Sequence, residues 1–227
     1  METMNDSGNL WDFDFSGWGD DDVTPPGAEP KEAAEPVEKR SHRRRTALLE
    51  VSEKYEYRRA FSETKLLDLC GEFRFTEGHS YNFITGGDID SLSFLKCILR
   101  QQNLDYCLAS TWCLAGEDIL QFGAWVDDGK IRHLDFYVGE IFPGSYRVEW
   151  EMLQEMYAKR PGLGRYAVFR NHSKIYAGTG DKFAFGIQSS ANINTNPRTE
   201  QACITIDRGL YQFYRDYFDG IKTIVKD

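Results

Sequence analysis

The sequence predicts an α/β fold, an αβα sandwich around a mixed β-sheet, preceded by an acidic N-terminal tail. From about Leu48 onward, strand patterns alternate with helix patterns, which is typical of such a sandwich. The 227 residues suffice for one domain, and 41% of them are hydrophobic, so a substantial core can form. Charge divides the chain: residues 1–38 hold eleven acidic residues and one basic residue, whereas residues 39–227 hold 25 acidic and 26 basic residues. We therefore expect a disordered tail and basic linker over residues 1–45 and one folded domain over residues 46–227.

The first half of the domain is expected to contain three strands and three helices. Strands are expected at 81–85, 106–112 and 131–141. The first helix follows a cap at Asp90 or Ser91 and carries Leu92, Leu95, Ile98 and Leu99 on one face, and further helices are expected at 118–126 and 148–157.

The second half is expected to contain three strands and a final helix. The strands are predicted at 166–177, 183–188 and 202–206. Asp207 is a plausible cap for the helix, whose spacing predicts an apolar face made of Leu210, Phe213, Tyr214, Tyr217, Phe218 and Ile221. No internal repeat is present in the sequence.

The tail holds four of the seven prolines and a run of aromatic residues from Leu10 to Trp18. Low hydrophobicity with many prolines and charges predicts disorder. The aromatic run is either a motif that docks on a protein partner or an incidental part of a solvated tail. The tail is also a candidate autoinhibitory mimic of nucleic acid. The basic run from Lys39 to Arg45 either touches a phosphate backbone or is a solvated linker.

The five cysteines form no CxxC pair and no metal-ligand spacing, which indicates free thiols in a reducing compartment. No apolar run has membrane-spanning length, and the acidic N-terminus is unlike a signal peptide. We therefore expect a cytoplasmic protein without a membrane partner.

The residues that carry chemistry are concentrated near the end of the chain. His172 and Lys174 stand two residues apart, so on a strand they would project to the same face. Ser189-Ser190-Ala191-Asn192 and then Glu200 follow. A nucleophile, a cation, a neutral donor and an orienting acid are the groups needed to attack a phosphodiester without metal or another cofactor.

This pattern resembles the phospholipase D superfamily, whose signature is His-x-Lys, a later Asp, then Gly/Ser-Ser-x-Asn and a downstream Glu. The close resemblance runs from Asn171 to about Glu200. The family's Asp has a counterpart in Thr179, and the nearest acid is Asp181, two residues later. Either the hairpin is longer and presents Asp181 differently, or the Asp is absent.

The resemblance implies catalytic roles for His172 as nucleophile, Lys174 and Asn192 as ligands of the phosphate oxygens, and Glu200 as a partner of a histidine ring. Other residues are candidates for substrate binding: Ser189, Ser190, Arg198, Ser110, Thr111 and Glu140. Arg198 has the fork geometry that suits phosphate, and the last three lie near predicted strand ends.

Phospholipase D chemistry needs two histidines, and this chain has one His-x-Lys. Family members with one motif pair two chains, so we expect a homodimer with His172 from both chains at one site. The resemblance implies a nuclease of DNA or RNA, because small members of the family with one motif are mostly nucleases. The motif beside an acidic tail suggests a phage or mobile-element setting. The alternative is a dimer of the same fold that binds nucleic acid or protein without cutting; a lipid phosphodiesterase is a distant third.

Overall fold

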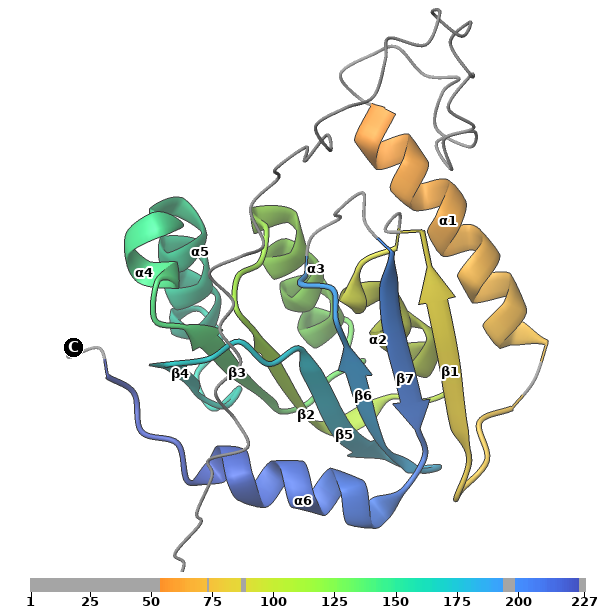
Figure 1. The fold of residues 1–227 in the computed structure, drawn as a ribbon. Coiled ribbons are helices and arrows are strands. Elements are labelled where there is room, and N and C mark those ends of the chain that lie inside the picture. The colour runs from red at the N-terminus through yellow and green to blue at the C-terminus, as the bar shows by residue number, and fades with distance from the viewer. Residues whose placement is uncertain (1–53, 73, 87–88, 194–198, 225–227) are drawn as a thin grey trace, which may run out of the picture. The chain divides into compact units, whose positions relative to one another are not determined.

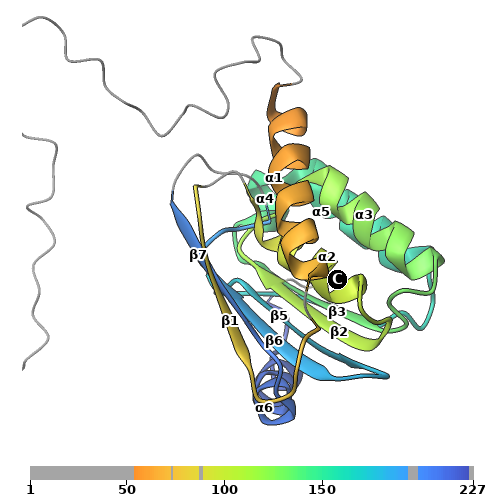
Figure 2. The same ribbon diagram turned by 90° about the vertical axis from the view of Figure 1, so that its right-hand side faces the viewer.

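The computed structural model describes residues 54–72, 74–86, 89–193 and 199–224. The predicted tail, its aromatic run, the basic linker and Arg198 lie outside the described residues. In the part that is described, a mixed sheet of seven strands runs in the order β1-β7-β6-β5-β2-β3-β4. Helices cover both faces of this sheet, so the predicted α/β sandwich around a mixed sheet is confirmed (Figures 1 and 2).

The strands fall into a parallel and an antiparallel part. The strands are β1 (Ser80–Thr85), β2 (Leu104–Thr111), β3 (Leu134–Gly139), β4 (Tyr166–Phe169), β5 (Ile175–Gly180), β6 (Ala184–Ser189) and β7 (Glu200–Thr205). The neighbours β2, β3 and β4 are parallel, whereas β2-β5-β6-β7-β1 are joined by antiparallel pairings. The strand ends that meet at the upper edge in Figure 1 therefore come from distant parts of the chain.

Of the helices in the described residues, five lie on one face of the sheet and one lies on the other (Figure 2). The five are α1 (Lys54–Gly71), α2 (Ser91–Leu99), α3 (Gly116–Asp127), α4 (Phe142–Ser145) and α5 (Arg147–Ala158), and α6 (Arg208–Asp219) crosses the opposite face. The predicted caps are confirmed, since Asp90 accepts a hydrogen bond from Ser93 N at the start of α2 and Asp207 accepts one from Leu210 N at the start of α6.

Each face of the sheet has its own core. Alternation along β2 explains this, because Cys107 and Ala109 pack toward α1–α5 whereas Tyr106 and Leu108 pack toward α6.

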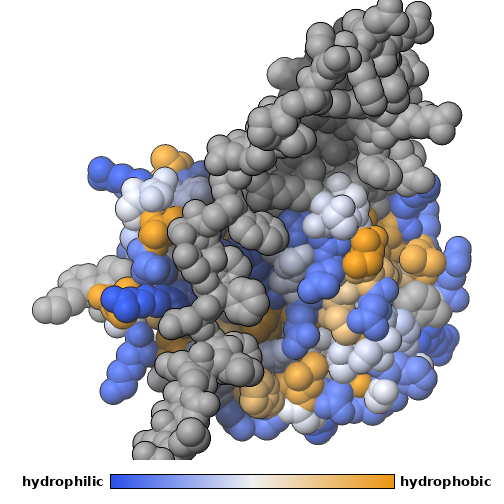
Figure 3. Space-filling view, viewed as in Figure 1, coloured by the Kyte–Doolittle hydropathy of each residue, from blue (hydrophilic) through white to orange (hydrophobic). Residues whose placement is uncertain are grey.

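Two predictions made from the sequence need correction. Phe213 and Tyr217 are 65% and 58% exposed, because α6 buries the face formed by Tyr211, Tyr214 and Phe218. On the α6 side, shown in Figure 3, hydrophobic residues are scattered among hydrophilic ones.

The second correction concerns the strand predicted at 166–177, which is two strands. β4 lies at one edge of the sheet beside β3, and β5 lies in the interior beside β2, so the chain crosses two strands between them. The crossing is made by residues 170–174, and this segment contains the His-x-Lys motif. The motif therefore lies on a loop and not on a strand.

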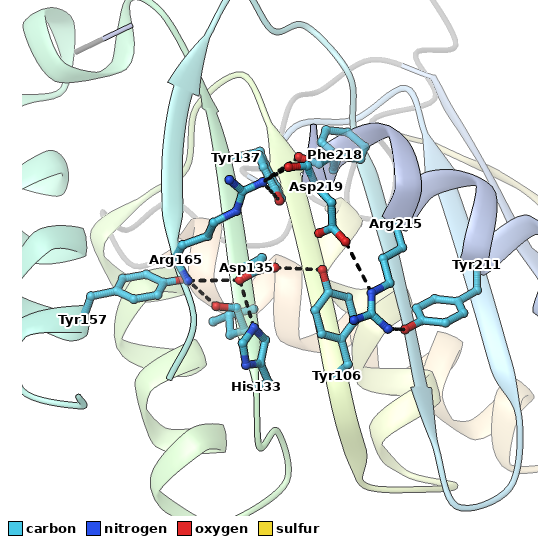
Figure 4. A network of polar contacts seen from close by, with 11 residues as sticks. Tyr106, His133, Asp135, Tyr137, Tyr157, Arg165, Tyr211, Arg215, Phe218 and Asp219 are labelled. Carbon is cyan, nitrogen blue, oxygen red and sulfur yellow. Dashed lines mark hydrogen bonds and ion pairs between the residues drawn. The ribbon is translucent and has the colours of Figure 1, made fainter. Parts of the chain in front are cut away.

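A polar network fastens α6 to the sheet (Figure 4). Arg165 donates to the carbonyl oxygens of Phe218, Asp219 and Ile221, at or just beyond the end of α6. Asp135, only 5% exposed, accepts from Tyr106 Oη at 2.8 Å and from Arg165 N at 3.0 Å. The network is a structural clamp that ties α6 to β2 and β3 through Tyr106, Asp135 and Tyr137.

In the described residues, no helix is both long enough and apolar enough to cross a membrane.

Candidate active site

The predicted site residues that the structure describes gather at one end of the strands, which we call the site edge of the sheet. It is formed by the ends of β1, β2, β3 and β6 and by the starts of β5 and β7. The register makes this explicit: Ser110 pairs with Ile175, Ile175 pairs with Gln188, and Ser189 pairs with Ala202. The antiparallel pairings therefore bring the His-x-Lys loop and the Ser-Ser-Ala-Asn segment to adjacent positions.

His172 lies on the loop before β5 and is exposed. Its ring faces the indole of Trp112, with 5.5 Å between the ring centroids and 52° between the planes. The imidazole thus has an aromatic neighbour on one side and remains open to a substrate.

Lys174 folds back toward His172. Its Nζ donates to the carbonyl oxygen of His172 at 2.8 Å and lies 3.0 Å from Nδ1 and 3.4 Å from Nε2 of the same ring. The side chain is buried, and burial lowers the pKa of the Lys174 ammonium, while Cys113 and Glu200 act in the opposite direction. The cation is therefore held against the imidazole in a partly desolvated position, where its charge acts strongly on nearby groups.

The Ser-Ser-Ala-Asn segment continues from the end of β6. Ser189 N donates to the backbone oxygen of Lys174 at 3.0 Å, which ties this segment to the His-x-Lys loop. Asn192 is half-buried, and its Oδ1 is buried without a hydrogen-bond partner among the described residues. A buried amide oxygen without a donor is costly, so this atom marks a polar position that a ligand or partner group can satisfy.

Glu200 begins β7 at the same edge. Its carboxylate accepts a hydrogen bond from Ser190 Oγ, and Ser190 Oγ also accepts from Gln201 N at 2.9 Å. The described residues contain no hydrogen bond between Glu200 and a histidine. Glu200 thus ties the start of β7 to the segment that follows β6 within one chain, and its electrostatic effect reaches Lys174.

The serines also line an open groove beside the site. The groove has a volume of about 410 Å³ and is bordered by β1, β6 and β7, including Ile84, Gln188, Ser189, Ser190 and Gln201. Ser189 and Ser190 therefore belong both to this groove and to the Ser-Ser-Ala-Asn segment.

Ser110, Thr111 and Glu140 support the loop in different ways. Ser110 and Thr111 are 1% and 0% exposed, and Thr111 Oγ1 donates to the backbone oxygen of Cys113. Both hydroxyls therefore lie beneath the site and face no substrate in this chain. Glu140 is exposed, and its carboxylate accepts a hydrogen bond from Asn171 N at 3.3 Å.

Thr179 and Asp181 lie at the far end of β5 from the His-x-Lys loop. Thr179 pairs with Tyr106 and Ala184, and Asp181 follows in the turn before β6, where it lines a separate hollow with Gln102 and Lys130. The longer hairpin therefore does not carry Asp181 back to the site edge.

Sequence reasoning missed two residues that shape the site. Asn171 is buried and links the His-x-Lys loop to β2 and β3, donating to the carbonyl oxygens of Thr111 and Tyr137. Gly139 lies so close to Trp112 that a Cβ built on it would be 2.5 Å from Trp112 Cδ1. The sequence carried one signal, an Asn directly before the motif, because Asn is frequent in turns. No residue near Gly139 in the sequence indicates that it packs against the site.

Among the described residues, no group of three or more His, Cys, Asp or Glu side chains is arranged to hold a metal ion.

No family model matches the chain. No curated protein matches it either. Solved structures do show similarity of fold. A polyphosphate kinase from Porphyromonas gingivalis has a TM-score of 0.48 and 12% identity, over 65% of this chain and 27% of that one.

NucT from Helicobacter pylori has a TM-score of 0.45 and 13% identity, over 62% of this chain and 94% of that one. A phosphatidylserine synthase from Haemophilus influenzae Rd KW20 has a TM-score of 0.42 and 11% identity, over 61% of this chain and 38% of that one. These similarities concern the arrangement of helices and strands, and they assign no activity to this chain.

Proposed function

We propose that the chain is a metal-independent phosphodiesterase of the phospholipase D type, acting as a nuclease on DNA or RNA. The observation that carries the proposal is the pair at the site edge: an exposed imidazole, His172, with the Lys174 ammonium 3.0 Å from its Nδ1. A nucleophile beside a fixed cation is suited to phosphoryl transfer, where the main tasks are positioning and stabilisation of charge.

The proposed reaction proceeds in two displacements. A ring nitrogen of His172 attacks phosphorus, a nitrogen–phosphorus bond forms, and the bond to the leaving oxygen breaks while that oxygen receives a proton from an acid. Water then attacks the phosphohistidine, gives up a proton to the same group, and releases phosphate monoester and free imidazole. Lys174 offsets the negative charge on the non-bridging oxygens throughout.

A second imidazole is needed as that acid, and the described part of this chain places no other histidine at the site edge. His79 precedes β1, at the end of that strand that lies away from the site edge. His133 directly precedes β3 and pairs with Asp135. We therefore propose a homodimer in which a second copy supplies its own His172. Asn192 Oδ1 is then available to a group that comes from the substrate or the second copy.

A nucleic-acid substrate is supported by two features. The near-neutral balance of residues 39–227 does not repel a polyanion, unlike the acidic balance of the whole chain. The groove lined by Ser189 and Ser190 offers room for part of a bound strand at the end of β6. The small single-motif members of the family that the motif resembles are mostly nucleases, which favours the same substrate class.

One observation favours a second candidate, a dimer of this fold that binds nucleic acid or protein without cutting it. Glu200 is engaged by Ser190 within the chain, and Thr179 stands where the family has an Asp. A site with these two departures could retain affinity for phosphate after losing turnover.

The test is cleavage in the presence of EDTA. Wild type, His172→Ala and, as a matched control, His79→Ala would be assayed on single- and double-stranded DNA and RNA and on an aryl phosphodiester. We expect cleavage by wild type and His79→Ala and none by His172→Ala. Cleavage by His172→Ala would refute the mechanism, and binding without cleavage by wild type would favour the second candidate.

The dimer has its own test. If each site needs two imidazoles, chains of wild type and His172→Ala that are unfolded together and refolded as a mixture will show activity proportional to the square of the wild-type fraction. Activity linear in that fraction would show that one imidazole per site is enough. Sedimentation velocity would establish the mass of the active species.

A further inference from the structure

The loop that carries His172 is shaped by the residue before it. Asn171 Oδ1 accepts a hydrogen bond from Ser173 N at 2.9 Å, which closes a turn in which a side chain imitates a backbone carbonyl. His172 is the middle residue of this turn. The direction in which its side chain leaves the backbone is therefore set by a contact between its two neighbours.

The turn is reinforced by a closed ring of three side chains. Asn171 Nδ2 donates to Ser110 Oγ at 3.0 Å, the hydroxyls of Ser110 and Ser173 are 2.7 Å apart, and Ser173 Oγ donates to Asn171 Oδ1 at 2.7 Å. An amide nitrogen can only donate and an amide oxygen can only accept. The hydroxyl of Ser110 must therefore donate to that of Ser173, and every donor in the ring has an acceptor.

The orientation of the Asn171 amide is determined by the groups around it. Its Nδ2 faces two carbonyl oxygens, Thr111 O at 3.2 Å and Tyr137 O at 3.3 Å, while its Oδ1 faces the N–H of Ser173. Exchanging the two amide atoms would set oxygen against oxygen and nitrogen against N–H. Only one orientation is compatible with these neighbours, so the ring anchors the turn to the ends of β2 and β3 in a single geometry.

Asn171 itself cannot touch a substrate, because it is only 4% exposed. We propose that Asn171 is a positioning residue, which acts through the Ser110–Ser173 ring to aim the His172 imidazole away from the sheet and into the site. The kinetic part of this inference rests on the proposed function, whereas the part that concerns the orientation of the imidazole does not.

The test uses two variants that damage the ring to different degrees. Asn171→Ala removes both the turn and the ring, and Ser110→Ala opens the ring but keeps the contact between Asn171 and Ser173. The matched control is Ser93→Ala, a fully buried serine of α2 whose hydroxyl donates to Glu63 at 2.8 Å. Retention of fold is checked for each variant by circular dichroism and urea unfolding.

The first readout is independent of activity. NMR spectra of the imidazole nitrogens report the tautomer and titration midpoint of each histidine, and His172 is identified by the signal lost in His172→Gln. We expect the His172 signals to change in Asn171→Ala and Ser110→Ala, whereas those of His79 and His133 stay as in wild type. Ser93→Ala should change none of them.

The second readout is kinetic. We expect kcat to fall by roughly 10-fold or more in Ser110→Ala and further in Asn171→Ala, with KM within about two-fold of wild type, since a displacement of about 1 Å at a reacting group can cost 10²-fold in rate. Unchanged His172 signals in a folded Ser110→Ala would overturn the inference, even if Asn171→Ala fails to fold. If wild type cleaves nothing, the proposed function fails, and the NMR readout still decides the role of Asn171.

Discussion

The ammonium of Lys174 lies 2.8 Å from the backbone oxygen of His172 and 3.0 Å from Nδ1 of the same residue. One lysine therefore contacts both the backbone and the ring of the proposed nucleophile. This arrangement places positive charge where a phosphate would arrive, and it does so at a position that is largely shielded from water.

Lys174→Met should separate catalysis from stability. We expect kcat to fall by roughly 10²–10³-fold, the usual loss when one group that stabilises a developing oxyanion is removed. We expect no loss of stability, because a buried ammonium opposes folding and methionine fills a similar volume. Cleavage assays and urea unfolding measure the two effects, and a variant that cuts at the wild-type rate would remove Lys174 from the mechanism.

The lowered pKa of Lys174 predicts an alkaline limit to activity. Because burial disfavours the charged form, the folded chain releases this proton at a lower pH than the ordinary value of 10.5. At pH values between the lowered pKa of the folded chain and 10.5, the unfolded chain binds more protons at this group than the folded chain does. The free energy of unfolding therefore rises with pH over this range because of this group. The cleavage rate falls over the same range, because Lys174 loses its positive charge. In Lys174→Arg the limit should move to higher pH, which a pH–rate profile of both proteins measures. If the alkaline limit is the same in both proteins, it arises from the titration of a group other than Lys174.

Gly139→Ala should disturb the wall of the site. The added Cβ would lie 2.5 Å from Trp112 Cδ1, 2.9 Å from Trp112 O and 3.1 Å from Asn171 O, and two of these neighbours are backbone atoms that do not move freely. Overpacking of this kind costs about 1–3 kcal/mol of unfolding free energy. Gly144→Ala is the control, because nothing lies within 4 Å of its added Cβ. Equal urea midpoints for the two variants would contradict the prediction.

Arg165→Met should loosen α6. Its guanidinium donates to three carbonyl oxygens at or beyond the end of α6 and to Tyr137 Oη at 2.9 Å. Loss of these contacts should lower the free energy of unfolding by about 1–3 kcal/mol and speed amide exchange in α6. Arg132→Met is the control, since that arginine pairs with Asp105 in solvent and should change stability by less than about 0.5 kcal/mol. Unaltered exchange in α6 would show that the clamp is dispensable.

Asp181→Asn should leave catalysis intact. The carboxylate lies in the turn at the far end of β5 from the His-x-Lys loop. A substitution at such an exposed position typically changes free energies by less than about 0.5 kcal/mol, so kcat should stay within about two-fold of wild type. A larger fall in the cleavage rate would mean that Asp181 does serve as the motif's acid.

Local features of the fold could be predicted from the sequence, and features that depend on packing could not. The caps at Asp90 and Asp207 were predictable because a cap involves residues three positions apart. The division of 166–177 into β4 and β5 was not, since it depends on which strands each half joins. Likewise, the exposure of Phe213 depends on how α6 is rotated against the sheet.

The candidate site shows the same division. His172, Lys174, Asn192 and Glu200 form a pattern that can be read along the chain, and the structure brings their segments to one edge. The residues that pack around the His-x-Lys loop could not be predicted from the sequence. Gly139 and Trp112, for example, lie 27 residues apart in sequence and meet only in the folded sheet. The burial of Lys174 likewise arises from neighbours that are distant in sequence.

The strand order has a consequence for how the protein is made. β1 begins at Ser80, and its one partner in the described sheet is β7, which ends at Thr205. β2 likewise joins β5 across some 70 residues of chain. Closing such long loops costs conformational entropy before the stabilising contacts between the strands form, so folding should be slow for a domain of this size. On the ribosome, the amino-terminal strand must wait for nearly the whole domain to emerge, and the site edge is completed only when β7 inserts between β1 and β6.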